Sequence, residues 1–392
     1  MTSAPSAPIG RVPTGLDEVP AAVEAVLGDF FDDAVPAAAR IDPRVGDAAE
    51  SLRAFVLQGG KRVRPVFAYA GWLAGRSASG CDVGARPEAP TSEDALRVAS
   101  SLELVQACAL VHDDIIDRSD TRRGHPTVHR VFESAHRADS WAGDAAHHGV
   151  AAAILLGDLA LAWADDMVHG HIPGTDSPAG GDATVLSPRP LPAAVGRVWS
   201  SMRTEVLGGQ YLDIVNEASG DETVASAYRV MEFKTAAYTV ARPLELGATL
   251  AGASSSLIGA LRSVGHDLGI AFQLRDDLLG VFGDPARTGK PSGDDLVAGK
   301  RTALLAVGLT AAGARDPRRA EELRDHLGRA LTDDEVQAAR DLLVDVGAVD
   351  EIEQQITTLL NSALRTLDEM DVSMQVRDEL SGFARRIAHR AT

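Results

Sequence analysis

Hydrophobic residues recur with helical spacing along nearly the whole chain, and this periodicity constrains the fold more than any other feature. From about Glu18 onward apolar positions repeat every three or four residues, and the clearest run, residues 94–117, contains no glycine or proline. Thr332 and Glu335 have the spacing of a capping box and open a helix that Gly347 can close. Strand patterns, in which apolar and polar residues alternate, are nearly absent. The sequence therefore predicts an all-α protein.

Two internal segments and one terminus interrupt this helical pattern. Residues 75–94 and 170–192 are rich in glycine and proline and are predicted to be surface loops inserted between helices. The motifs on either side of each loop share one chemistry, so the loops are not expected to separate domains. Residues 1–20 contain four prolines and no apolar run, which predicts a disordered tail. Residues 21–392 are expected to form one large helical domain.

Charge and cysteine content exclude several classes of protein. The chain of 392 residues has 38 basic and 56 acidic side chains, a net charge of −18, which argues against a nucleic-acid-binding protein because that function needs an excess of lysine and arginine. Two cysteines cannot form a disulfide scaffold and favour a reducing, cytoplasmic setting. No run of apolar residues approaches the roughly 18–20 that a membrane helix requires. We expect no signal peptide and no membrane span.

An aspartate-rich motif, DDIID, stands at the end of the clearest helical run. On a helix Asp113 and Asp117 project from one face, where two like charges require a positive partner. Such carboxylates suit magnesium, which also binds substrate phosphates. Arg122 and Arg123 follow beside a Gly-Pro turn and can fork onto phosphate oxygens. The alternatives are a solvated acidic helix end and arginines that pair with the preceding aspartates.

A second aspartate pair and a basic loop extend this chemistry. Asp276 and Asp277 lie in a helical segment that a glycine–lysine loop follows, which indicates either the other half of a metal–diphosphate clamp or a helix end leading into a polar loop. Residues 59–65 hold two glycines followed by three basic residues, the composition of an anion site or of a solvated basic turn. Weaker signals, each more typical of structure than of function by itself, are Gly209, Gln210, Asp213, Lys234 and Thr235.

In their order and spacing these segments resemble the trans-prenyl (polyprenyl) diphosphate synthases, over about residues 40–390. The matching segments are GGKRVRP at 59–65, DDIID at 113–117, RRGHP at 122–126, GQYLD at 209–213, KT at 234–235, and FQLRDDLLG at 272–280 with the GKPSGDDLVAGKRT that follows. The resemblance implies an isoprenoid synthase type fold, in which helices surround a deep central cavity and the two aspartate motifs face each other across its mouth.

The resemblance also implies a role for each matching residue. Magnesium ligands are implied at Asp113, Asp117 and Asp276, with three Mg²⁺ bridging them to an allylic diphosphate, and Asp114 belongs to the same catalytic motif. The residues implied to bind the allylic diphosphate are Arg122, Lys234 (also counted as catalytic), Lys290 and Lys300. Those implied to form the isopentenyl diphosphate pocket are Lys61, Arg64, Gln106 and Arg123. The polar groups implied to line the reaction centre are Thr235 and Gln273.

The implied reaction is a metal-assisted chain elongation. The allylic carbon–oxygen bond breaks to give a carbocation and a diphosphate, whose negative charge magnesium and lysine stabilise. The double bond of isopentenyl diphosphate then attacks the cation, and a proton is lost to the released diphosphate. One departure from the family pattern is Gly280, which stands where the second motif usually has an aspartate. Because Asp276 is intact, we expect activity to survive, and Asp284 or Asp294 can contribute indirectly.

The residues that precede the first motif indicate the product length. Cys108 and Ala109 lie about one helical turn deeper than Asp113, ~6 Å at 1.5 Å per residue, and Val105 lies below them. In the family, aromatic residues here close the cavity floor after a C15 product, whereas small residues leave room for another five-carbon unit. We therefore expect the C20 product geranylgeranyl diphosphate, with longer products as the next expectation. The alternative is that these small residues simply pack against a neighbouring helix.

Two other functions stay open at the level of the sequence. A class I terpene cyclase would ionise the same kind of diphosphate but needs no isopentenyl pocket, so the matching pocket residues count against it. A non-catalytic subunit of a heteromeric synthase should have lost aspartates from its motifs, and only Gly280 hints at such a loss. The expected partners are two small diphosphates and a second copy of the chain in a homodimer, without nucleic acid.

Overall fold

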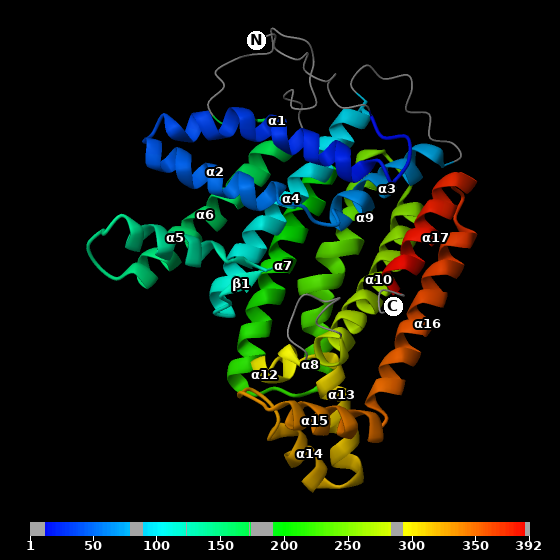
Figure 1. Ribbon diagram of the computed structural model, residues 1–392. Helices are drawn as coiled ribbons and strands as arrows, with labels where there is room; N and C mark the ends of the chain where they lie inside the picture. The colour runs from blue at the N-terminus through cyan, green and yellow to red at the C-terminus, as the bar shows by residue number, and fades with distance from the viewer. Residues whose placement is uncertain are drawn as a thin grey trace. The chain divides into compact units, whose positions relative to one another are not determined.

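Long helices make up almost all of the structure, as the periodicity predicts (Figure 1). The computed structural model describes residues 12–78, 89–122, 124–171, 173, 191–283 and 293–388. In these ranges the β structure is a single short hairpin, in which β1 (Thr121–Arg122) pairs antiparallel with β2 (His125–Pro126). The predicted all-α class is confirmed.

The described helices divide into two compact units. The first falls within Met1–Leu73, Asp82–Gly196 and Thr249–Gly252, and the second within Ala74–Cys81, Arg197–Ala248 and Ala253–Thr392. Each unit contains one of the two aspartate motifs. The prediction of one domain over residues 21–392 stays a prediction.

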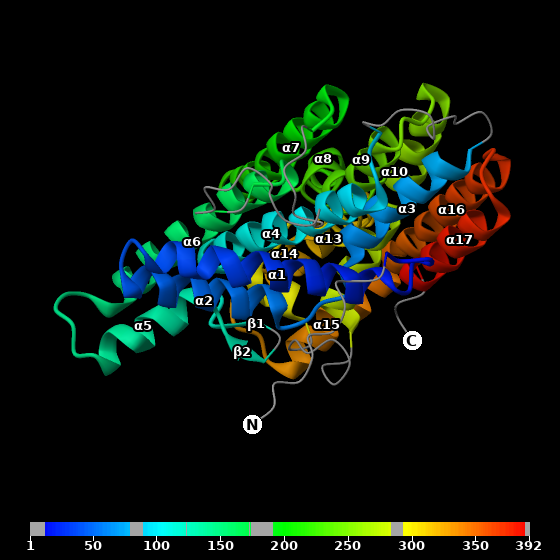
Figure 2. The ribbon, with the colours of Figure 1, turned by 90° about the horizontal axis from the view of Figure 1, so that it is seen from above.

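The first unit is built around its longest helix, α4 (Ser92–Ile116). Its other helices are α1 (Val19–Ala39), α2 (Pro43–Leu57), α3 (Val63–Ser77, whose last turn belongs to the second unit), α5 (Val128–Ala138) and α6 (Ala145–Val168). α1 and α2 lie side by side, and α4 packs against α1 and α6 (Figures 1 and 2). Because α4 is covered on most of its faces, its apolar residues are nearly all buried.

The helix predicted over residues 94–117 is confirmed as α4, and local capping explains where it begins. The Thr91 hydroxyl accepts a hydrogen bond from the Asp94 N–H at 3.4 Å, and the Asp94 carboxylate accepts one from the Thr91 N–H at 2.9 Å. This reciprocal capping box satisfies backbone groups that the first turn of a helix leaves without partners. The helix ends at the first aspartate motif, with Asp117 as its C-cap.

Part of the N-terminal segment belongs to the first unit. The side chain of Leu16 is buried, and the Tyr69 hydroxyl donates a hydrogen bond to the carbonyl oxygen of Pro13 at 3.1 Å. α1 begins at Val19, which is also buried. The predicted disorder of residues 1–20 therefore does not hold for residues 12–20, because apolar side chains there pack into the unit; residues 1–11 lie outside the described ranges.

The second unit is organised by α10 (Ser255–Phe282). Its other elements are α7 (Ala193–Ser219, whose first turn belongs to the first unit), α8 (Val224–Val230), the π-helix η1 (Met231–Ala241), α9 (Arg242–Leu250, whose last two residues belong to the first unit), α12 (Asp294–Ala298), α13 (Ala303–Arg315), α14 (Pro317–Arg324), α15 (Asp333–Asp345), α16 (Ala348–Glu369) and α17 (Met374–Ala388). α10 packs against η1 on one side and α16 on another. The capping box of Thr332 and Glu335 opens α15 as predicted, and Gly347, with φ +83°, separates α15 from α16.

The two predicted loop insertions lie largely outside the described ranges. α3 continues to Ser77 and α4 begins at Ser92, so helix occupies both edges of the segment 75–94. α7 begins at Ala193, directly after the segment 170–192. Residues 79–88 and 174–190 are not described.

Candidate active site

The structure divides the first aspartate motif into two accessible carboxylates and one buried anchor. Asp113 lies in the last turn of α4, and the N–H of Asp117 donates to its carbonyl oxygen at 2.8 Å. Asp113 is partly exposed and Asp117 is exposed, whereas Asp114 is buried. Since residues four apart share a helix face and the next residue does not, Asp113 and Asp117 are the pair available to a ligand.

Asp114 is held by Arg122 of the hairpin. The Arg122 Nε lies 2.9 Å from both carboxylate oxygens of Asp114, and its Nη2 lies 2.7 Å from Oδ1 and 3.6 Å from Asp113 Oδ2. Burial raises the pKa of Asp114, and the hydrogen bonds from Arg122 oppose this shift. Arg122 thus supplies the positive charge that the clustered aspartates require. Its predicted contact with diphosphate stays a prediction, and Arg123 lies outside the described residues.

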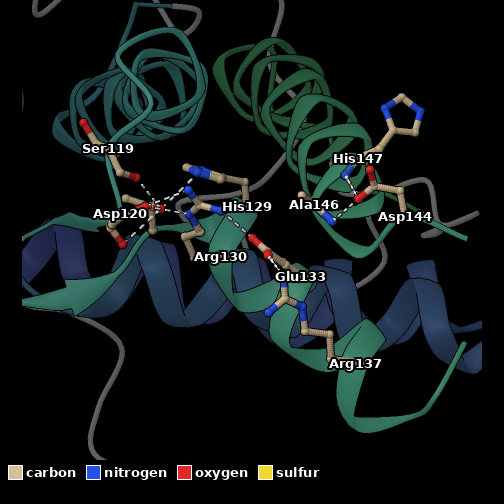
Figure 3. A network of polar contacts seen from close by, with 10 residues as sticks. Ser119, Asp120, His129, Arg130, Glu133, Arg137, Asp144, Ala146 and His147 are labelled. Carbon is tan, nitrogen blue, oxygen red and sulfur yellow. Dashed lines mark hydrogen bonds and ion pairs between the residues drawn. The ribbon is translucent and has the colours of Figure 1, made fainter.

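A network of polar contacts anchors the segment that carries Arg122 (Figure 3). The Thr127 hydroxyl donates to the carbonyl oxygen of Ser119 at 2.8 Å. From α5, Arg130 reaches Asp120 at 2.7 Å and Glu133 at 2.5 Å. The first contact joins the two ends of the hairpin to each other and the second joins one end to α5, so together they hold the backbone that carries Arg122.

The basic loop leads into α3, and two of the predicted isopentenyl diphosphate residues, Lys61 and Arg64, lie here, whereas Gln106 lies on α4. Gly59 and Gly60 have backbone φ angles of +96° and +149°, a range that residues with a Cβ rarely adopt. Lys61 is exposed and Arg64 is partly exposed at the start of α3. Between them Arg62 is buried and pairs with Glu103 of α4 at 2.5 Å. Sequence reasoning assigned no role to Glu103, because nothing local in the sequence relates two residues 41 positions apart.

In the second unit, two residues whose functional role the sequence indicated only weakly, Lys234 and Asp213, form an ion pair. Lys234 Nζ of η1 lies 2.6 Å from Asp213 Oδ2 of α7. One turn earlier on α7, a Cβ at Gly209 would lie 2.3 Å from the backbone nitrogen of Lys234, so only glycine permits this approach. η1 is a π-helix, a form that is rare and often found at functional sites. Thr235 lies beside Lys234 and is partly exposed.

The second aspartate motif is also divided between an accessible and a buried carboxylate. Asp276 is partly exposed, whereas Asp277 is buried. Asp277 accepts hydrogen bonds from Gln273 Nε2 at 2.9 Å and from the N–H of Ala303, at the start of α13, at 3.0 Å. The pKa of Asp277 is raised to about 7, with burial as the largest cause. The hydrogen bonds from Gln273 and Ala303 lower this pKa, and the neighbouring carboxylates of Asp295 and Asp276 raise it. Gln273, predicted to line the reaction centre, thus holds the buried member of the motif.

Gly280, the departure from the family pattern, leaves room for Asp295 of α12. A Cβ built at Gly280 would lie 1.8 Å from Asp295 Oδ2 and 2.5 Å from its Cγ, so any other residue would force the carboxylate away. Asp295 is buried, and its carbonyl oxygen accepts a hydrogen bond from the N–H of Lys300 at 3.0 Å. The sequence suggested Asp284 or Asp294 as a contributor beside Gly280. The structure places Asp295 there, while Asp284 and Lys290 lie outside the described residues.

The three residues expected to form the product floor face different surroundings. Val105 and Cys108 are buried, whereas Ala109 is partly exposed and lies one turn before Asp113. Cys108 Sγ lies 3.7 Å from Nδ1 of His112, whose Nε2 lies 3.1 Å from the carbonyl oxygen of Ile154 on α6. Cys108 therefore faces α6, and Ala109 is nearer the face of the accessible aspartates.

The accessible carboxylates suit magnesium in chemistry and number. Magnesium takes one or two protein carboxylates together with substrate phosphates and water. In the first unit Asp113 and Asp117 are such carboxylates, and in the second unit Asp276 is one. Within the described residues no group of three or more histidine, cysteine, aspartate or glutamate side chains could hold a metal ion by itself.

Comparison with known proteins identifies the family. A model of the polyprenyl synthetase family matches residues 47–343, more than half of the chain. The chain belongs to this family and is a trans-prenyltransferase, as the motifs predicted.

Relatives at moderate identity agree with this assignment. The geranylfarnesyl diphosphate synthase of Aeropyrum pernix is 34% identical over 297 residues, which cover 76% of this chain and 79% of that protein. The geranylgeranyl diphosphate synthase of Mycobacterium tuberculosis is 36% identical over 250 residues, 64% of this chain and 59% of that protein. The crystal structure of geranylgeranyl pyrophosphate synthase from Corynebacterium glutamicum, complexed with isoprenyl diphosphate and magnesium, has 46% identity and a TM-score of 0.83 and covers 96% of this chain and 99% of that one. The isoprenoid synthase type fold is thereby confirmed.

Proposed function

We propose that this enzyme condenses an allylic diphosphate with isopentenyl diphosphate and releases geranylgeranyl diphosphate. The observation that carries the proposal is that the first unit holds two separate charged groups. One is the accessible carboxylate pair of Asp113 and Asp117, and the other is the basic loop with Lys61 and Arg64. A carboxylate pair serves ionisation of one diphosphate, and a second diphosphate needs a cationic site of its own.

In the proposed mechanism the chain's residues bind, orient and neutralise the substrates. Asp113, Asp117 and Asp276 would hold magnesium, and the proposed number of magnesium ions is three. Bound magnesium stabilises the negative charge of the leaving diphosphate. Lys234 and Lys300 add positive charge to the same diphosphate. The isopentenyl double bond attacks the allylic cation, and the proton leaves to the released diphosphate. No dedicated protein base is required.

Product analysis tests the proposal against its alternatives. The purified chain is incubated with magnesium, isopentenyl diphosphate and each allylic primer in turn, and the products are sized by chromatography. A linear C20 diphosphate is expected. A cyclised hydrocarbon would instead indicate a terpene cyclase, and activity that appears only after addition of a partner chain would indicate a non-catalytic subunit. The relatives do not favour either alternative.

Product length provides the first mutational prediction. Ala109→Phe places a ring one turn before Asp113 and is expected to shift the major product from C20 to C15, because the side chain shortens the cavity. Cys108→Phe is expected to shorten the product less, since Cys108 faces α6. Product sizing measures both variants, with Ala109→Ser as the small-for-small control. An unchanged profile in both phenylalanine variants would contradict the floor assignment, and a C25 product of the unmodified enzyme would contradict C20.

We also propose a homodimer, because helix faces in both units expose apolar side chains. On α6, Ile154 and Leu155 are 44% and 69% exposed, and on α7, Leu207 and Tyr211 are 50% and 67% exposed. α6 is long and apolar enough to cross a membrane, and 28% of its most apolar 18-residue stretch is buried. However, Asp158 lies on the exposed side of α6, and a charge there is costly in lipid. We therefore propose that a second copy of the chain covers these exposed apolar side chains of α6 and α7.

The oligomeric state is measured by sedimentation equilibrium. A mass twice that of the chain is expected at micromolar concentration, and Leu155→Glu is expected to shift the population toward the monomer by placing a charge in the interface. A monomeric wild-type chain that is fully active would contradict the proposal.

A further inference from the structure

Arg62 lies between two predicted substrate-binding residues, yet it points into the protein. Its side chain is 4% exposed, whereas neighbouring Lys61 is exposed. Its Nη1 lies 2.5 Å from Oε2 of Glu103 on α4, and its Nη2 donates to the carbonyl oxygen of Val56 in the last turn of α2 at 2.7 Å. One guanidinium therefore joins the end of α2, the basic loop and the middle of α4.

The backbone of the loop depends on this contact. Arg62 has φ of +45°, a left-handed conformation that is uncommon and strained for a residue with a Cβ. Gly59 and Gly60 also have positive φ, which glycine adopts without steric strain because it has no Cβ. A strained non-glycine residue persists where the surrounding structure holds it in place. For Arg62 this support comes from the buried ion pair with Glu103 and the hydrogen bond to the carbonyl oxygen of Val56.

The pair also relates the predicted pocket residues to one another. Arg62 is flanked by Lys61 and lies two residues before Arg64, while Glu103 lies three residues before Gln106 on α4. A shift of the loop along α4 would therefore change the distances among Lys61, Arg64 and Gln106. Since both members of the pair are buried, neither is available to bind substrate itself.

We propose that the Arg62–Glu103 ion pair is a positioning pair for the isopentenyl diphosphate pocket. It holds the basic loop at one register on α4, so that cationic and amide groups from two elements meet one diphosphate. This inference rests on the proposed function, because the substrate it concerns is the second diphosphate of that reaction.

Steady-state kinetics with each substrate varied separately test the inference. Glu103→Gln keeps the shape of the side chain and removes its charge. It is expected to raise KM for isopentenyl diphosphate about tenfold, the effect of weakening one hydrogen bond to a charged group, and to leave KM for the allylic diphosphate within about twofold. Arg62→Lys, which can reach one of the two partners but not both, is expected to shift the same KM in the same direction.

Two matched variants separate positioning from general loss of structure. Glu205→Gln removes the same charge from another arginine–glutamate pair between helices, the one with Arg242, at 2.5 Å. It is expected to leave the ratio of the two KM values unchanged. Lys61→Ala is expected to raise KM for isopentenyl diphosphate without lowering Tm, because Lys61 is exposed.

The outcomes distinguish the inference from the function beneath it. If Lys61→Ala raises KM for isopentenyl diphosphate while Glu103→Gln and Arg62→Lys leave it within twofold, the pair has only a structural role. An equal rise in both KM values would overturn the positioning role in the same way. If Glu103→Gln does not fold, Arg62→Lys decides by the same criterion. Absence of elongation by the wild-type enzyme would overturn the proposed function and the inference together.

Discussion

Asp113→Asn is expected to lower kcat for chain elongation by about 10³-fold while leaving the fold intact. Asp113 is partly exposed in the last turn of α4, and its backbone contact with Asp117 does not involve the side chain. The amide keeps the size of the carboxylate but loses the charge that a magnesium ligand requires. Loss of one preorganised group that stabilises developing charge typically costs about 10²–10³ in kcat, and a metal ligand lies at the upper end of that range.

Measurement of kcat over a magnesium titration checks this prediction. The variant is expected to need more magnesium for half-maximal activity and to keep the circular dichroism spectrum of the wild type. Asp47→Asn, which changes an exposed aspartate on the surface of α2, is the control and is expected to leave kcat within about twofold. A variant at Asp113 that kept more than a tenth of wild-type activity would contradict the assignment of this residue as a magnesium ligand.

Gly280→Asp is expected to impair the enzyme although it introduces the residue that the family usually has at this position. The new Cβ would lie within 1.8 Å of Asp295 Oδ2, and the new carboxylate would add negative charge beside Asp295 and buried Asp277. Overpacking of this kind costs about 1–3 kcal/mol of the free energy of unfolding. Because the N–H of Lys300 donates to the carbonyl oxygen of Asp295, displacement of Asp295 also moves a residue predicted to bind diphosphate.

A double-mutant cycle separates the steric contact from other effects. Thermal unfolding and kcat are measured for Gly280→Asp, Asp295→Gly and the double variant. The double variant is expected to recover part of the stability and activity lost in Gly280→Asp, because removal of the Asp295 side chain frees the space. Gly280→Ala, which adds a methyl group without charge, is expected to destabilise less than Gly280→Asp. Equal stability of Gly280→Asp and the wild type would contradict the contact described for Asp295.

These two predictions differ in how much of their basis was visible in the sequence. Asp113 and Asp117 are four residues apart, so helical geometry alone placed them on one face, and α4 confirms the helix that carries them. The contact of Gly280 with Asp295 was not predictable in the same way. The sequence offered several nearby aspartates as candidates, and the choice among them depends on how α12 packs against α10.

The buried members of the motifs show the same limit. The sequence placed Asp114 in the catalytic motif but not among the magnesium ligands, and the structure buries it against Arg122. It left Gln273 as a possible reaction-centre residue, whereas the structure has it donating to Asp277. In each case the residue type was informative, but the direction of the side chain followed from neighbouring elements.

What the sequence determined by itself was local. Apolar periodicity specified the helices, capping residues such as Thr332 and Glu335 specified where one helix begins, and motif spacing specified the family. Each of these features is encoded within a few turns of one helix or in the order of segments along the chain. Only the tertiary structure decided that Arg62 turns inward to Glu103, that Lys234 meets Asp213, and that Asp295 fills the space beside Gly280. Those pairings join residues far apart in sequence, and their geometry is set by the packing of whole helices, which no local pattern records.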